Sequence, residues 1–68
     1  MSEDNIKNQV YMFRQKAEIT QEQLATAVGV TRQTIIAIEK GNYTPSITLA
    51  LKLAQFFHLA VEDLFLLK

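Results

Sequence analysis

Apolar residues recur every three or four positions along most of the chain, a spacing that places them on one face of a helix. These stripes predict helices over residues 9–17, 21–28, 32–40 and 47–57, and a short helix within residues 61–67. No stretch alternates apolar and polar residues as a half-buried strand does. The pattern therefore predicts an all-α protein of five helices.

Small polar residues and glycines mark the ends of these helices. The residues placed to act as N-caps are Asn8, Thr20, Thr31 and Ser46. Gln23, three positions after Thr20, completes a capping box for the second predicted helix. Gly29 and Gly41 follow the second and third helices, where a residue with positive φ is favoured. The second and third predicted helices are therefore short, well bounded and separated by a tight turn.

The 68 residues have room for one domain, which we place at residues 6–68 behind a flexible tail of residues 1–5. The chain has no cysteine, which excludes a disulfide scaffold, a cysteine nucleophile and a cysteine zinc site. The first residues are acidic where a signal peptide needs a basic segment, and no run approaches the roughly 20 apolar residues of a membrane span. We expect a cytoplasmic protein that does not enter the membrane.

Residues suited to catalysis or metal binding are scarce. His58 is the only imidazole, and with Glu62 it supplies too few ligands for a metal site. The sequence has no paired acids, no Ser/His or Cys/His arrangement and no phosphate loop. We expect no enzyme activity, no metal, no cofactor and no small-molecule effector.

Residues 21–40 satisfy the positional requirements of a helix-turn-helix. Its fifth residue, where the two helices cross, is the small Ala25, and its ninth, in the turn, is Gly29. The positions that must face the core are all apolar: Leu24, Val28, Val30, Ile35 and Ile38. The alternative, an ordinary helical hairpin, does not require an alanine and a glycine at those two places. This pattern therefore favours binding of double-stranded DNA.

The outward face of the third predicted helix offers groups that can read base edges. Arg32 can bond guanine and Gln33 adenine, each through two hydrogen bonds. Ile36 on the same face is either a contact to a thymine methyl or a stray apolar residue. Thr31, at the cap, can touch a base or a phosphate. Lys40 is placed to bind the phosphate backbone.

The segments T-R-Q-T-I, I-E-K-G, Y-T-P-S and E-D-L-F resemble the Xre/Cro, lambda-repressor-like helix-turn-helix family over about residues 6–65. Within it the chain is most similar to short stand-alone regulators such as the cytolysin repressor. The resemblance implies a five-helix DNA-binding fold and a homodimeric transcriptional regulator.

The resemblance also assigns roles to individual residues. It implies that the chain after the recognition helix runs along the DNA backbone, although a polar surface loop is the alternative. With the starts of the second and fourth helices, the expected phosphate contacts are Gln21, Lys40, Asn42, Tyr43, Thr44 and Ser46. Arg14 and Glu39 are charged residues on otherwise inward faces, and the resemblance implies that they form a partly buried salt bridge. The chain has no net charge, but residues 24–61 hold three cationic residues and one acidic one.

Four large apolar residues in succession, residues 64–67, exceed what so small a chain can bury. We expect a homodimer interface formed by Val61, Leu64, Leu66 and Leu67. The alternative is that Leu64 and Phe65 complete the core of a monomer. The resemblance also allows Ile6 and Lys7 to pair with Leu66 and Leu67 as short terminal strands.

Three functions fit these features. The first is a regulator, expected to be a repressor, that binds a pseudo-palindromic operator as a homodimer. The second is the antitoxin of a toxin-antitoxin pair, although only 11 residues follow Phe57. The third is a helical adaptor that holds a protein on the same face. The polar face of the third helix favours the first.

Overall fold

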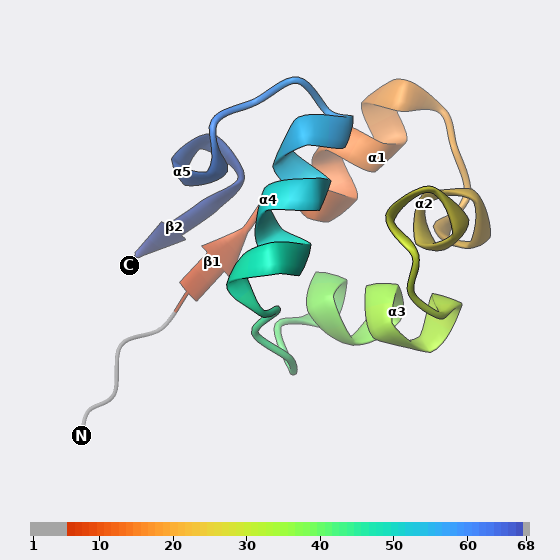
Figure 1. The fold of residues 1–68 in the computed structure, drawn as a ribbon, viewed down its shortest axis with the longest axis horizontal. Helices are drawn as coiled ribbons and strands as arrows, with labels where there is room; N and C mark the ends of the chain where they lie inside the picture. Colours follow the sequence, from red (N-terminus) through yellow and green to blue (C-terminus); the bar gives the residue numbers. More distant parts are fainter. Residues whose placement is uncertain (1–5, 68) are drawn as a thin grey trace.

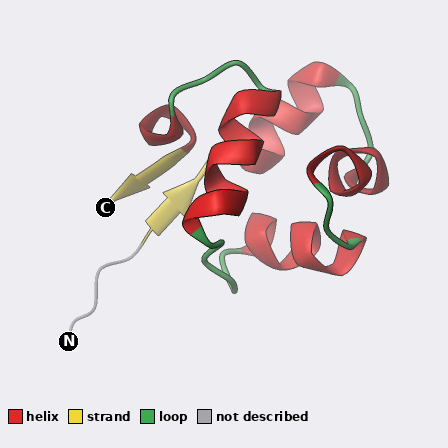
Figure 2. Ribbon diagram, in the orientation of Figure 1, coloured by secondary structure: helices red, strands yellow, loops and turns green. Residues whose placement is uncertain are grey.

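The computed structural model of the chain describes residues 6–67, so the predicted tail at residues 1–5 lies outside the described part, as does Lys68. Five helices are joined by short loops, and a two-stranded sheet brings the two ends of the chain together (Figures 1 and 2). The elements are β1 (Ile6–Asn8), α1 (Val10–Ala17), α2 (Gln21–Val28), α3 (Arg32–Lys40), α4 (Ile47–Phe56), α5 (Val61–Leu64) and β2 (Phe65–Leu67).

The core is formed by apolar side chains from all five helices. Its fully buried larger members are Val10, Leu24, Ile35, Ile38, Leu53 and Leu64. Figure 1 shows α4 in the middle of the molecule, with α1 behind it, α2 and α3 on one side and α5 with the sheet on the other. The predicted five-helix, lambda-repressor-like fold is confirmed, and the helix-turn-helix is formed by α2 and α3.

The predicted caps of α2, α3 and α4 are present. The Thr20 hydroxyl accepts the Gln23 backbone N–H at 3.0 Å, and the Gln23 side chain accepts the Thr20 N–H at 2.8 Å. Thr31 and Ser46 each accept the N–H three residues on. Both glycines take left-handed backbone angles, with φ of 80° at Gly29 and 81° at Gly41. The turn geometry therefore follows directly from local residue choice.

The start of α1 differs from the prediction. The N-cap is Gln9, and its side chain makes no capping bond. Asn8 instead ends strand β1, and its side chain both accepts the Val10 N–H at 3.1 Å and donates to the Ile38 carbonyl at 2.8 Å. Asn8 pairs with Phe65 as the last residue of β1, so the N-cap of α1 is the next residue, Gln9. Asn8 thereby joins the sheet to the end of α3.

The terminal strands pair antiparallel within one chain. Ile6 lies opposite Leu67, Lys7 opposite Leu66 and Asn8 opposite Phe65. The pairing that the sequence allowed between the two chain ends is therefore present. It closes the fold by holding α5 against the start of α1.

Helix α4 is central, yet one side of it is open. Leu53 is fully buried, whereas Ile47 is 80% and Leu51 54% exposed. Leu64 is fully buried within the chain, as the alternative prediction, that it completes the core of a monomer, requires. It therefore has no exposed surface with which to contact a second copy. The described helices include none that is long and apolar enough to cross a membrane.

Candidate nucleic-acid interface

Helix α3 presents its first turn to solvent. Arg32 and Gln33 are exposed, and so is Thr31, whose hydroxyl caps the helix and lies 3.2 Å from the Thr34 hydroxyl. The opposite face of the helix buries Ile35 and Ile38 completely in the core. Burial of that face fixes the rotation of α3 about its axis. The side chains expected to read bases are therefore free at one edge of the molecule.

Two further residues expected on this face differ in exposure. Lys40, the last residue of α3, is exposed. Ile36 is half-buried, so only part of its side chain lies on the open side. Its two proposed roles, thymine contact or stray apolar residue, both stay predictions.

The segment from α3 to α4 carries the expected phosphate-binding groups on its outside. Asn42, Thr44 and Ser46 are exposed, and Tyr43 is 47% exposed. The first helical residue of α4 is Ile47, so its N-terminal N–H groups lie beside this loop. Such N–H groups bind anions. The loop and α3 thus form one continuous polar edge.

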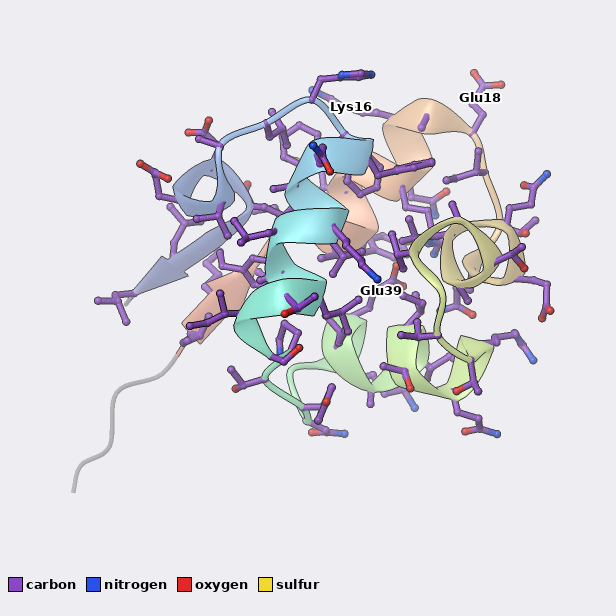
Figure 3. All side chains as sticks on the ribbon, in the orientation of Figure 1. Lys16, Glu18 and Glu39 are labelled. Carbon is purple, nitrogen blue, oxygen red and sulfur yellow. The ribbon has the colours of Figure 1, made fainter. Side chains whose placement is uncertain are left out.

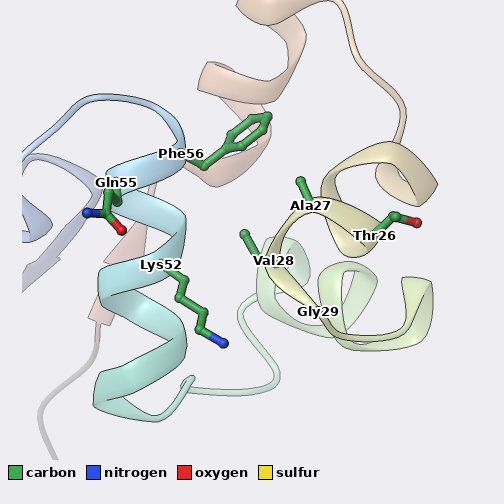
Figure 4. A pocket seen from close by; sticks show the side chains of 7 residues that line it. All are labelled: Thr26, Ala27, Val28, Gly29, Lys52, Gln55 and Phe56. Atoms are coloured by element: carbon green, nitrogen blue, oxygen red, sulfur yellow. The ribbon is translucent and has the colours of Figure 1, made fainter.

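Lys52 is a residue that the sequence analysis did not assign. It is the only charged residue of α4, and its side chain extends from that helix toward the end of α2 at Gly29 (Figure 4). A hollow brings it together with Tyr43 and Ser46. Its place as the single charged residue of α4 is the signal that would have singled it out.

An ion pair behind the face ties α1 to α3. Arg14 donates through Nε to Glu39 Oε2 at 2.7 Å and through Nη2 to Oε1 at 3.2 Å, so the predicted salt bridge is present. Nη1 donates to the Ile19 carbonyl, and the guanidinium lies 5.4 Å from the centre of the Tyr11 ring. The hydrogen bond to Glu39 raises the pKa of Arg14 above its ordinary value. Arg14 is therefore held in its charged form.

Gln21 joins the same cluster. Its Nε2 donates to Glu39 Oε1 at 3.1 Å, which links the first residue of α2 to the ion pair. Glu39 lies towards the interior, whereas Lys16 and Glu18 lie on the outside, away from α3 (Figure 3). Gln21 was predicted as a phosphate contact; one of its two amide hydrogens is engaged here. The cluster joins the three helices α1, α2 and α3 behind the polar edge.

The charge of this edge is positive once the ion pair is considered. Glu39 is neutralised by Arg14, and no other salt bridge forms among residues 6–67. Lys40 and Lys52 therefore keep their charges available for an anionic partner, whereas Arg32 shares a hollow with Glu18 and Glu22. Residues 6–67 hold no group of three His, Cys, Asp or Glu side chains placed to bind a metal.

A capped helix pair with a glycine turn and a cationic, hydrogen-bonding outer face defines a helix-turn-helix domain. A family model described as helix-turn-helix matches residues 10–64, and the chain belongs to this family, of the Xre/Cro type. Membership agrees with the expectation that the chain is not an enzyme.

Relatives and a solved structure cover most of the chain. An uncharacterized HTH-type transcriptional regulator of Methanocaldococcus jannaschii is 52% identical over 61 residues, which are 90% of this chain and 92% of the relative. The uncharacterized HTH-type transcriptional regulator YgzD of Bacillus subtilis is 49% identical over 63 residues, with 93% and 96% covered. The crystal structure of the restriction-modification controller protein C.AhdI from Aeromonas hydrophila is similar with a TM-score of 0.75 and 25% identity, covering 81% of this chain and 83% of that one.

Proposed function

We propose that this protein is a transcriptional repressor that binds a pseudo-palindromic DNA operator as a homodimer. The observation that carries the proposal is the exposed first turn of α3. Arg32 and Gln33 are exposed there, and the opposite face of the helix is buried in the core. Helices of this kind enter the major groove with their N-terminal residues at the base edges. The relatives described above are named as transcriptional regulators, which supports the same function.

In this proposal some residues contact DNA bases and others contact the phosphate backbone. Arg32, Gln33 and, at the helix cap, Thr31 contact bases, together with the exposed part of Ile36. Phosphates are bound along both sides of α3, by the start of α2 and by the loop that leads into α4. The proposed phosphate contacts are Gln21, Lys40, Asn42, Tyr43, Thr44 and Ser46, to which we add Lys52.

A dimer is proposed because one domain presents too small a reading surface. Nine residues of helix are about 13 Å long, which spans about four base pairs. A two-fold dimer repeats this surface about 34–36 Å away, one turn of DNA further on. The paired helices then read two half-sites related by symmetry.

The proposed dimer surface is the apolar face of Ile47, Leu51, Val61, Leu66 and Leu67. Three of these side chains are largely exposed: Ile47 is 80%, Leu51 54% and Leu67 73% exposed. Ile47 and Leu51 lie one helical turn apart, and Leu51 and Val61 line one hollow between α4 and α5. Apolar area of this kind marks an interaction site on a small domain. Leu64 is left out of the proposed surface because it is buried.

The base-reading assignment is tested with an operator obtained by selection from random duplex DNA. Arg32→Ala and Gln33→Ala are expected to lose discrimination at one or two base pairs per half-site, by about 1–3 kcal/mol each. Lys40→Ala is expected to weaken binding to all sequences alike. The matched control is Lys16→Ala, which removes a lysine far from α3 (Figure 3). An unchanged sequence preference in Arg32→Ala would reject its role as a reader.

The dimer is tested separately by light scattering and sedimentation at micromolar concentration. The double variant Leu51→Asp/Leu67→Asp changes two residues that are already more than half exposed, so circular dichroism should remain that of the wild type. We expect a monomer with weakened operator binding. Ala27→Asp places one such charge on the exposed side of α2 and serves as the control for the oligomeric state. A monomeric wild type, or a double variant that stays dimeric, would reject this surface.

A further inference from the structure

A hollow of about 370 Å³ lies beside α3 on the side of the following loop. Gln33, Thr34 and Ala37 line it from the helix, where spacings of three and four put them on one side. Asn42 and Tyr43 line it from the loop. Gly41 makes this possible, because its φ of 81° ends α3 and turns the chain back, and the Asn42 N–H then bonds the Ala37 carbonyl at 2.9 Å. The hollow is thus an open surface depression at the end of the helix.

The chemistry of this hollow is apolar in part and uncharged throughout. Ala37 contributes a methyl group, and Tyr43 is a large aromatic side chain that is 47% exposed. The Thr34 hydroxyl is already paired with Thr31, 3.2 Å away. The amides of Gln33 and Asn42 supply the free polar groups. No charged side chain lines the hollow, so a metal ion would lose water there without gaining an opposite charge.

We propose that this hollow receives the C5-methyl group of a thymine in the operator half-site, while the Gln33 amide bonds the adenine of a neighbouring base pair. The proposal rests on the proposed function, which places α3 in the major groove. Thymine is the base that presents a methyl group in that groove, and apolar side chains are its partners there. Glutamine is suited to N6 and N7 of adenine. Ile36 does not line the hollow, so the methyl contact at this subsite falls to Ala37 and Tyr43, and the base contact proposed for Ile36 lies elsewhere on α3.

Tyr43 has two separable parts in this arrangement. Its ring forms one wall of the methyl subsite, and its hydroxyl is left for the phosphate contact proposed above. Removing the hydroxyl and removing the ring should therefore have different effects. Tyr43 lies outside the helices and the core, so both changes are compatible with folding.

The experiment uses the full chain and its selected operator, in which each thymine of a half-site is replaced in turn by uracil. Uracil lacks only the C5-methyl group. We expect one thymine per half-site whose replacement by uracil weakens binding about threefold to tenfold. This fold-change corresponds to the free energy of burying one methyl group. In Tyr43→Phe this uracil effect should persist, even if overall affinity falls. In Tyr43→Ala it should shrink to less than twofold.

Different results separate failure of this inference from failure of the proposed function. If selection yields no preferred sequence, the proposed function itself is wrong. If a preferred operator is found but no thymine is sensitive to uracil, the methyl subsite is rejected while DNA recognition stands. The subsite is also rejected if the sensitivity survives Tyr43→Ala at full size. Loss of the sensitivity in Ile36→Ala, with retention in Tyr43→Ala, would assign the methyl contact to Ile36 instead.

Discussion

The helix-turn-helix and the terminal region end their helices by different means. In residues 20–41, each helix starts at a threonine hydroxyl and ends at a glycine in the left-handed conformation. In the terminal region, residues 6–18 and 58–67, neither α1 nor α5 has a side-chain bond from its N-cap residue. The left-handed positions there are Glu18 at φ 58° and His58 at φ 61°, where a glycine would be less strained.

Contacts distant in sequence replace local caps in the terminal region. The Gln9 backbone N–H donates to the Leu64 carbonyl, and its side chain donates to the Asp63 carbonyl, both at 2.9 Å. Asn8 reaches the Ile38 carbonyl across 30 positions of sequence. The comparison teaches that the helix-turn-helix is specified by local signals, whereas the terminal region depends on contacts between residues far apart in the sequence. Four changes test that difference, from the largest expected effect to the smallest.

The ion pair that joins the two regions should have the largest effect. Arg14→Ala or Glu39→Ala leaves a charge in the interior without its partner, since both side chains are 10% exposed or less. We expect each to lower the free energy of unfolding by about 3–5 kcal/mol. The double change should cost less than the sum of the two. Urea denaturation of all four proteins measures this coupling, and additive effects would show that the two regions are joined by other contacts.

Asn8→Ala should remove the link between the sheet and the end of α3. The Ile38 carbonyl also accepts the Gly41 N–H at 2.9 Å, so the main loss is one partly buried bond and the partner of the Val10 N–H. We expect a cost of about 1–2 kcal/mol in urea denaturation. Gln9→Ala, which removes an exposed bond, is the control and should cost less. Equal costs would mean that burial does not distinguish these two links.

Thr20→Ala should lower the free energy of unfolding by removing a local cap of the helix-turn-helix. The change removes the capping box at the start of α2. We expect a loss of about 1 kcal/mol, with Thr20→Ser retaining most of the stability. Hydrogen exchange of the Gln23 amide should increase in the alanine variant. An alanine variant as stable as the wild type would show that packing, and not the cap, holds α2.

Ala60→Ser should give the terminal region a cap of the kind found in the other half. Ala60 has φ −73° and ψ 151°, close to the angles of the capping residue Thr20 at −85° and 165°. The Asp63 N–H already donates to the Ala60 carbonyl at 3.0 Å, and the serine hydroxyl can share this donor as the Thr31 hydroxyl shares the Thr34 N–H. We expect a gain of about 0.5–1 kcal/mol in the free energy of unfolding. Ala60→Val cannot cap and is the control; a gain in both would assign the effect to packing.

Most of the helical framework could be predicted because its signals are local. The caps of α2 and α3 bond backbone groups within four residues of themselves, so they can be recognised without knowing the tertiary contacts. These caps are Thr20, Gly29, Thr31 and Gly41. The Arg14–Glu39 pair could be named because both charges lie on otherwise inward faces and the family resemblance implies that these two positions pair. The N-cap of α1 was misplaced at Asn8, since pairing with β2 extends the strand to that residue.

The candidate site was predicted less completely than the helices that carry it. The residues expected on the outer face of α3 were named from helical spacing, and Arg32, Gln33 and Lys40 are exposed. Lys52 was counted in the charge of residues 24–61 but was given no contact of its own, because its approach to Gly29 depends on how α4 packs against α2 (Figure 4). Tyr43 and Ala37 were not recognised as neighbours, since the turn at Gly41 brings them together.

The sequence by itself determined where the helices of the recognition unit start and stop, and which of their faces point inward, because caps and apolar spacing act within a few residues. Only the tertiary structure decided which apolar residues near the C-terminus remain outside. Leu64 and Leu67 are alike in the sequence, yet Leu64 is fully buried and Leu67 is 73% exposed. The difference arises because α5 packs onto the core, while β2 pairs with β1 at the edge of the molecule, and such packing joins residues nearly the whole chain apart.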